Sequence, residues 1–390
     1  MRRFAGLFVV AAAVVMAPGY AAAGDLKVYF GNLHAHTNMS DGKLSPAEAF
    51  AYARDVGKLD FMAVTDHEEQ IDPYYDPSDP KKWPREVEQT NASNADGTFV
   101  AILGYEWGSP TYNHINFFDI GDYFFTIDPY LPHVPLVKLW NQVGLYDSKN
   151  PPGAIFQFNH PDWDPENPVF NWNQFEYNAK AAQSAAFLEI KDPGQEKSYQ
   201  LALDKGWHVS AIYNQDNHDA DWGTENDCRA ALWMNGLTRK DLYEAMRARR
   251  GYSTCNKNTV VDFKGNGVWM GSNVDKKAIK LEWKITDTDP TDTIDKVEVI
   301  TNAGVVLKTE EPKANSTSGS FDVVADVSGT YYYLRITTTA PGGKPVAAMI
   351  YTGPIYYYLA PVTDGGTPDG SADGGSEPGS GGCSCSVVGL

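Results

Sequence analysis

Short apolar runs that end in His, Asp or Glu recur along the first two thirds of the chain, and they constrain its fold more than any other feature. Their aliphatic and aromatic content is typical of β-strands that enter a core. They cover residues 28–30, 59–64, 99–103, 115–118, 154–158, 186–190 and 209–213. Between the first two runs, Ser45, Pro46 and Glu48 supply an N-cap, a proline at the first helical position and a capping-box acid. The alternation of strands and helices predicts a parallel β/α architecture for residues 25–254.

The polar residues that follow these runs are expected to meet, because the carboxyl ends of parallel strands converge on one edge of the fold. His34 and His36 are two residues apart, so on an extended segment both side chains point to the same side. Asp41 follows in a Ser-Asp-Gly turn that can bring its carboxylate back to the same place. Of the 8 histidines, only His133 and His208 lie elsewhere, and we interpret them as structural or surface residues. One buried histidine is more often a core residue than a ligand, but the repetition at six or seven strand ends favours a cation site.

Length and charge limit the classes of partner. The 390 residues, 42% of them hydrophobic, are enough for a large core and for two domains. The formal net charge of -18 argues against a nucleic-acid backbone as the main partner, since phosphate binding needs a basic surface. The negative charge fits clustered acidic ligands for cations, or it simply keeps an exported protein soluble.

The strand-end motifs resemble, in order, those of the PHP (polymerase and histidinol phosphatase) superfamily. The matching motifs are His34-x-His36, Ser40-Asp41-Gly42, Thr65-Asp66-His67, Gly104-Tyr105-Glu106, His114, Asn159-His160-Pro161 and Asp216-x-His218. The first stretch and the segment around Glu106 are most similar to exported metallohydrolases of the CehA/McbA type, which are named for carbaryl-hydrolysing members. The likeness covers residues 26–254, including a terminal helix expected at 237–252.

The resemblance implies a distorted (βα)7 PHP-type barrel with three divalent metal ions, Zn, Mn or Fe. Carried over by position, one ion would be held by His34, His36, Glu106 and Asp216, a second by Glu106, His114 and His160, and a third by Asp41, His67 and His218. Asp41 stands where some members carry His, which changes the charge of the third site. A hydroxide bound by the metals would be the nucleophile, and the resemblance implies no separate catalytic side chain.

Three further residues are candidates for supporting roles. Asp66 is expected either to orient the neighbouring His67 as a carboxylate behind the ligand, or to satisfy backbone groups at a strand end. Lys191 and Arg229 are candidates for binding an anionic substrate, with an ordinary solvated charge as the alternative. Aromatic residues expected near the mouth would either line a pocket or pack beneath loops; they are Trp107, Tyr112, Trp163, Trp172 and Trp222.

The remaining segments have different characters. Residues 1–24 have the basic start, short apolar run and small residues of an export signal, which predicts a periplasmic, extracellular or cell-surface protein. Residues 255–359 read as short β-rich runs between turns, which predicts a small all-β sandwich domain. Residues 360–390 form a Gly/Ser/Asp-rich tail whose end, CSCSVVGL, resembles the start of a C-terminal sorting signal; it either attaches the protein to the cell surface or is a free tail. Cys228 and Cys255 are expected either to form a disulfide or to remain buried thiols.

Together these features predict a secreted metal-dependent hydrolase of small-molecule phosphoesters, a phosphatase or phosphodiesterase. The alternative is an ester or carbamate hydrolase of the carbaryl type, which the aromatic residues favour. A second alternative is an inactive barrel whose sandwich binds a surface ligand, and the complete ligand set argues against it.

Overall fold

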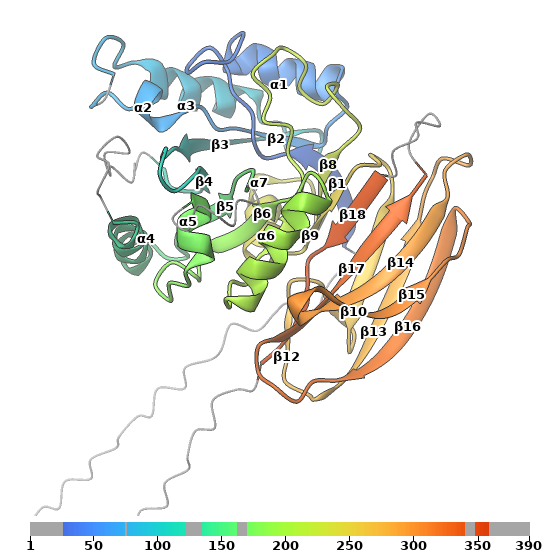
Figure 1. The fold of residues 1–390 in the computed structure, drawn as a ribbon. Coiled ribbons are helices and arrows are strands. Elements are labelled where there is room, and N and C mark those ends of the chain that lie inside the picture. Colours follow the sequence, from blue (N-terminus) through green and yellow to red (C-terminus); the bar gives the residue numbers. More distant parts are fainter. Residues whose placement is uncertain (1–25, 75, 122–134, 162–169, 340–347, 359–390) are drawn as a thin grey trace, which may run out of the picture. The chain divides into compact units, whose positions relative to one another are not determined.

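The computed structural model describes residues 26–358, except 75, 122–134, 162–169 and 340–347 (Figure 1). The expected export signal and tail, and also His133 and Trp163, lie outside the described residues. All described residues belong to one compact unit that ends at Tyr358. Among them there is no helix with the length and apolar character needed to cross a bilayer.

The first part of the chain mixes strands with helices (Figure 1). Its elements are β1 (Lys27–Asn32), α1 (Pro46–Asp55), β2 (Phe61–Val64), α2 (Glu68–Ile71), α3 (Lys82–Ser93), β3 (Val100–Trp107), β4 (Ile115–Phe118), α4 (Val137–Lys149), β5 (Ile155–Phe158), α5 (Phe170–Phe175), β6 (Ala185–Glu189), α6 (Pro193–Asp204), β7 (Ser210–Ile212), β8 (Arg229–Met234), α7 (Arg239–Arg247) and β9 (Gly251–Thr254). The segment labelled α5 is a left-handed turn, since φ is positive from Asn171 to Phe175.

The first helix begins as its sequence predicts. The Ser45 hydroxyl accepts from the backbone N–H of Glu48, and the Glu48 carboxylate accepts from the backbone N–H of Ser45 at 2.9 Å. Pro46 occupies the first turn, where its missing N–H costs nothing. This capping box fixes where the chain turns away after β1, and it therefore shapes the loop that carries His36 and Asp41.

The strands of this part form one sheet in the order β8-β1-β2-β3-β4-β5-β6-β7. The predicted parallel pairing is found for β1-β2-β3 and for β5-β6-β7. It is wrong for β4, which is antiparallel to both of its neighbours, and for β8, which is antiparallel to β1 and to β9. Only residues 108–114 join β3 to β4, too few for the helical crossover that a parallel pair requires. An isolated parallel bridge pairs Ala35 with Asn217, so the segments that follow β1 and β7 lie next to each other.

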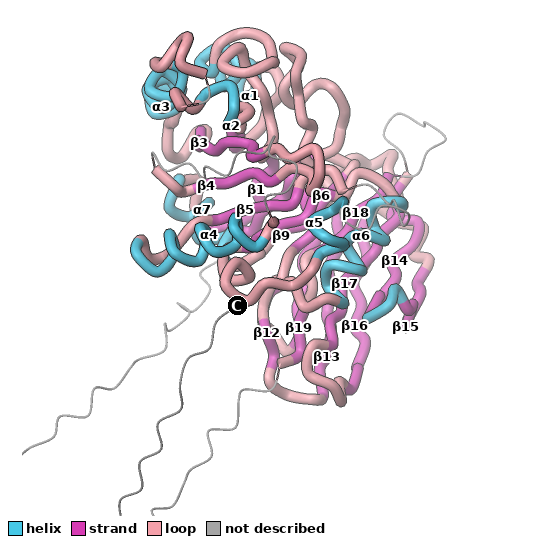
Figure 2. The backbone as a smooth tube through the Cα atoms, turned by 60° about the vertical axis from the view of Figure 1, so that its left-hand side comes forward, coloured by secondary structure: helices cyan, strands magenta, loops and turns pink. Residues whose placement is uncertain are grey.

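The part of the chain after β9 is built from strands. They are β10 (Val260–Gly265), β11 (Val268–Trp269), β12 (Asn273–Val274), β13 (Ala278–Thr286), β14 (Ile294–Thr301), β15 (Val305–Glu310), β16 (Ser316–Val324), β17 (Thr330–Thr338), β18 (Ala348–Thr352) and β19 (Ile355–Tyr357). Figure 2 shows that the one helical element described in this part is a short turn, η1 (Asn302–Gly304). Strands β11-β10-β13-β16 form a separate sheet, and its apolar residues share a core with those of β14 and β17.

Both parts of the described chain are joined by sheet pairing and by ion pairs. Strand β18 pairs with β9 on one side and with β17 on the other, so the first sheet continues into the all-β region. On helix α6, the buried Glu196 carboxylate accepts from both Arg335 Nη1 (3.0 Å) and the Tyr333 hydroxyl (2.6 Å). Cys228 and Cys255 form a disulfide that links the start of β8 to the residue after β9.

Candidate metal centre

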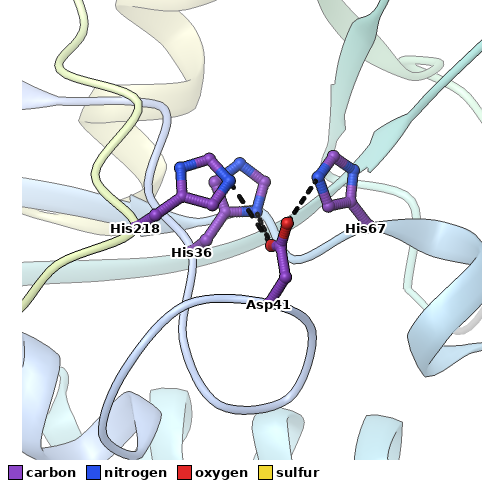
Figure 3. A group of neighbouring side chains, drawn as sticks. All are labelled: His36, Asp41, His67 and His218. Carbon is purple, nitrogen blue, oxygen red and sulfur yellow. Dashed lines mark ion pairs between the residues drawn. The ribbon is translucent and has the colours of Figure 1, made fainter.

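All nine residues proposed as metal ligands lie within one cluster at the ends of the central strands. Their ligand atoms form three groups, and within each group the atoms lie within 4.8 Å of one another. The groups are His34, His36 and Asp216; Glu106, His114 and His160; and His36, Asp41, His67 and His218. Figure 3 shows the third group, in which three imidazoles surround the Asp41 carboxylate. The chain thus brings together side chains that are up to 184 residues apart in the sequence because the strands that carry them are neighbours.

Glu106 occupies the middle of the cluster. It lies near the end of β3 and is 1% exposed. Its Oε1 atom is 3.2 Å from His34 Nε2, and its Oε2 atom is 3.3 Å from His36 Nε2. The other imidazoles that face it are those of His67, His114 and His160, at 3.2, 3.1 and 3.4 Å. A carboxylate that faces five imidazoles from all three groups is placed to bridge ions.

The other two carboxylates complete the groups from opposite sides. Asp216 Oδ1 is 3.1 Å from His34 Nε2 and 3.2 Å from His36 Nε2. Asp41 is half-exposed, with its oxygens 3.4 Å from His218 Nε2 and 3.7 Å from His67 Nε2 (Figure 3). The exposed side of Asp41 leaves the third group open to solvent.

The Asp66 carboxylate contacts the loop after β1 and not an imidazole. It accepts from the backbone N–H groups of Thr37 (2.8 Å) and Ser40 (3.1 Å), and from the hydroxyls of both residues. These contacts match the alternative in which Asp66 satisfies backbone groups, and none of its described contacts orients His67. The same loop requires a glycine at Gly42, since a Cβ there would lie 2.6 Å from the His36 backbone.

The donor arrangement fits cations. The His34 and His36 Nε2 atoms lie 3.1 Å apart, and both face the Asp216 carboxylate. The lone pairs of these atoms would repel one another, and a proton or a metal cation between them removes the repulsion. His67 Nδ1 is buried and lies 3.2 Å from Glu106 Oε2, but the two atoms do not form a hydrogen bond. Imidazoles with carboxylates and no thiolate suit Zn, Mn or Fe, which agrees with the metals that the sequence resemblance implies.

The shifts in the pKa values of the cluster also indicate that its environment favours positive charge. Burial by itself would lower the pKa of His36, but its hydrogen bonds to Asp216 and Glu106 outweigh burial and raise the pKa to about 9. The pKa of His34 is raised too, because the charges of Asp216 and Glu106 outweigh its burial. Conversely, the His34 charge and the contact with His36 hold the pKa of Asp216 low despite burial. Bound metal ions would supply the charge that protons otherwise provide.

The sequence predictions name only Asp66 as a carboxylate behind the ligands, whereas several other buried polar residues contact the cluster. Glu189 ends β6 fully buried, and its carboxylate accepts from His34 Nδ1 at 3.0 Å. Asn159 Nδ2 donates to Glu106 Oε1 at 2.8 Å, and Asn116 and Asn214 extend the network. The signal for Glu189 is an acidic residue at a buried position of an apolar strand, where an unpaired charge is rarely tolerated.

The candidate substrate-binding residues differ in their surroundings. Arg229 is 4% exposed and donates to the backbone carbonyls of Gly223, Asn226 and Cys228, so its guanidinium holds a loop and nothing described supports a substrate role. Lys191 is half-buried, and the negative charges of Glu189 and Asp216 outweigh its burial and raise its pKa. Its role in binding a substrate stays a prediction.

The aromatic residues pack into the core. Trp107, Trp172 and Trp222 are at most 2% exposed, and Tyr112 is partly buried against the same core as Trp107 and Trp172. A pocket of about 180 Å³ beside the cluster is lined by residues with no Phe, Tyr or Trp among them: His67, Glu69, Gly108, Ser109, Pro110 and His114. His208 stacks on Tyr356 with ring centroids 4.2 Å apart, and burial lowers its pKa to about 4, in agreement with the expected structural role.

Comparisons with known proteins give distant structural likenesses. No family model matches the chain, and no curated protein matches it. One similar solved structure is a two-domain protein from Bacteroides vulgatus containing a predicted PHP-like metal-dependent phosphoesterase, 16% identical, covering 85% of this chain and 96% of its own, with a TM-score of 0.45. Another is the CARDB domain of a Pyrococcus furiosus protein, which is 14% identical and covers 26% of this chain and 96% of its own, with a TM-score of 0.20. A third is an engineered protein, which is 11% identical and covers 85% of this chain and 87% of its own, with a TM-score of 0.25. Similarities at this level assign no family.

Proposed function

We propose that the chain is an exported, metal-dependent hydrolase of the PHP type that cleaves small-molecule phosphoesters. The observation that carries the proposal is the convergence of nine His, Asp and Glu side chains from strand ends on the buried Glu106 carboxylate. Structural ion pairs with Lys or Arg do not explain this arrangement, because among the described residues the ion pairs of its three carboxylates are all with its six imidazoles.

The three groups define how ions would be held. Glu106 is placed to be shared between ions, while Asp216 and Asp41 each serve one side of the cluster. Bound divalent ions would lower the pKa of a shared water and polarise the ester. The protein itself supplies fixed imidazole orientations, a buried carboxylate at the centre and an exposed rim at Asp41 through which substrate and water enter.

The surroundings of the cluster favour phosphoesters over carbamates. The residues that line the pocket include Ser109, Glu69 and two imidazoles, and the described tryptophans expected near the mouth, Trp107, Trp172 and Trp222, lie in the core, where they do not line a site for a naphthyl group. Lys191 is the cationic side chain that we propose for binding the anion; the negative charges of Glu189 and Asp216 raise its pKa and so keep it protonated. A non-catalytic binding module would not need a complete set of nine potential ligands.

Other parts of the proposal rest on the sequence. They are a distorted (βα)7 barrel formed by β1 to β7, kinship with the CehA/McbA type, export directed by residues 1–24 and surface attachment through residues 360–390. The bridge between Ala35 and Asn217 supports closure of the barrel at the metal-bearing edge.

The test combines metal analysis with turnover. Purified mature protein is analysed for metals and assayed with p-nitrophenyl phosphate, bis-p-nitrophenyl phosphate and 1-naphthyl N-methylcarbamate. We expect transition metals in the protein and turnover of a phosphoester, with both lost in Glu106→Gln and both kept in Glu196→Gln, a matched change at a buried carboxylate outside the cluster. Turnover of the carbamate alone would show that carbamates, and not phosphoesters, are the substrate class. Full activity of Glu106→Gln would refute the metal mechanism.

A further inference from the structure

We propose that Glu189 is a positioning residue that fixes two of the three ligand groups at once, by orienting the His34 imidazole and the backbone of His160. The inference rests on the proposed function as a metal-dependent enzyme. Glu189 is not among the predicted ligands, and it acts through residues that are.

The Glu189 carboxylate accepts hydrogen bonds on both oxygens. Oε1 accepts from His34 Nδ1 at 3.0 Å, from Gln157 Nε2 at 3.1 Å and from Asn214 Nδ2 at 3.0 Å. Oε2 accepts from the backbone N–H of His160 at 2.7 Å. Four donors from strands β1, β5 and β7, or from the residues that follow them, therefore meet on one buried side chain.

The first consequence concerns the tautomer of His34. An ionised carboxylate can only accept, so the proton of the neutral imidazole is held on Nδ1. Nε2 is then left with its lone pair directed at Asp216 Oδ1 and Glu106 Oε1, at 3.1 and 3.2 Å. A carboxylate behind a ligating imidazole also makes it more basic and fixes its plane.

The second consequence concerns the backbone of His160. Its φ is +28°, a conformation that residues other than glycine rarely adopt. The bond from the His160 N–H to Glu189 helps to hold this conformation, in which His160 Nε2 faces Glu106 Oε1 at 3.4 Å. The same carboxylate thus serves the His34 group and the His160 group.

The third group provides an internal reference. It consists of His36, Asp41, His67 and His218, and none of these has a described hydrogen bond or ion pair with Glu189. Loss of Glu189 is therefore expected to weaken metal binding selectively, and a general loss of folding would not be selective.

The decisive variant is Glu189→Gln. An amide has one acceptor oxygen and one NH₂ group, whereas Glu189 faces donors on both oxygens, so either rotamer sets an NH₂ against an N–H. We expect the affinity for Zn²⁺, measured by chelator competition, to fall about 10–100-fold at the two groups that contain His34 and His160. After dialysis against a chelator of intermediate strength, the variant should keep only the ion of the third group.

Two controls make the result specific. Glu196→Gln changes an equally buried carboxylate that contacts Arg335 and Tyr333, and it should leave Zn²⁺ binding unchanged. Asp41→Asn should show the reciprocal pattern, with loss of the third ion and retention of the other two. If Glu189→Gln does not fold, Glu189→Asp keeps the charge on a side chain too short to reach both sides, and it should weaken the same two groups less severely.

The possible outcomes distinguish failure of the positioning role from failure of the proposed function. Full Zn²⁺ loading in a folded Glu189 variant would overturn the positioning role and leave the proposed metal-dependent function standing. Uniform weakening of all three groups would also overturn it. A wild-type protein that binds no Zn²⁺ or Mn²⁺ would refute the proposed function and this inference together.

Discussion

Removal of metal should make the stability of the protein fall steeply between pH 6.5 and pH 9. In the folded chain the pKa of His36 is about 9 against an ordinary value of 6.5, because its hydrogen bonds to Asp216 and Glu106 outweigh its burial. Each tenfold preference for the protonated form is worth about 1.4 kcal/mol, so His36 alone contributes at most about 3 kcal/mol. The pKa of His34 is raised in the same direction.

The sign of the effect follows from which state binds the proton more tightly. The folded state holds the His36 proton more tightly than the unfolded chain, so the contribution is complete below pH 6.5 and is lost as the pH rises through about 9. The pKa of His67 is lowered, mainly by burial, so its contribution is lost below pH 6.5 and does not affect this range. Bound metal replaces the protons and should remove the dependence.

The measurement is urea unfolding, followed by tryptophan fluorescence, of chelator-treated and Zn²⁺-loaded protein at both pH values. Burial also raises the pKa values of Glu68 and Glu86 well above their ordinary range, so stability from these acids falls with rising pH in both preparations. The difference between the two preparations therefore isolates the cluster. The quantity to compare is the difference in unfolding free energy between loaded and chelated protein. If this difference is the same at pH 6.5 and at pH 9, the electrostatic reasoning is refuted.

Three further substitutions test separate parts of the structure. Cys228→Ser opens the disulfide to Cys255 across 27 residues and should cost about 3–4 kcal/mol of unfolding free energy, measured against wild type under non-reducing conditions. Asp66→Asn should loosen the Thr37–Ser40 loop, so metal titration should show a clear loss of metal affinity while calorimetry shows only a small fall in the thermal midpoint. Arg229→Met should lower the thermal midpoint and leave KM unchanged; a raised KM at unchanged stability would restore its substrate role.

The positions of the metal-centre residues could be predicted because they depend on a periodic feature. Each proposed ligand lies next to an apolar strand, and pairing of those strands brings the ends together whatever the details of the helices between them. His34 and His36 directly follow β1, and the capping box of α1 marks the end of the loop that returns Asp41 to them. Whether these side chains bind metal remains a prediction.

Other features depend on contacts between distant segments, which local sequence does not specify. The reversal of β4 follows from a connection that is too short, and it interrupts the parallel order without moving His114 out of the cluster. The partner of Asp66 could not be chosen, because a strand-end carboxylate can reach either a backbone N–H or an imidazole, and the loop geometry decides. Glu189 was missed because it lies within the apolar run and not after it.

The charge of the cluster links these observations to the kind of substrate. The chain carries a net charge of -18, and the pocket beside the cluster is lined by Glu69 with no Lys or Arg. An anionic ester would be repelled by such a surface if the protein alone set the potential. If the centre holds three divalent ions as proposed, the three carboxylates of the metal groups together with Glu189 would not neutralise them, and the loaded centre would carry a surplus of positive charge. Selectivity for anions in this acidic protein would therefore come from the metals, with Lys191 as the nearby cationic side chain in a supporting role.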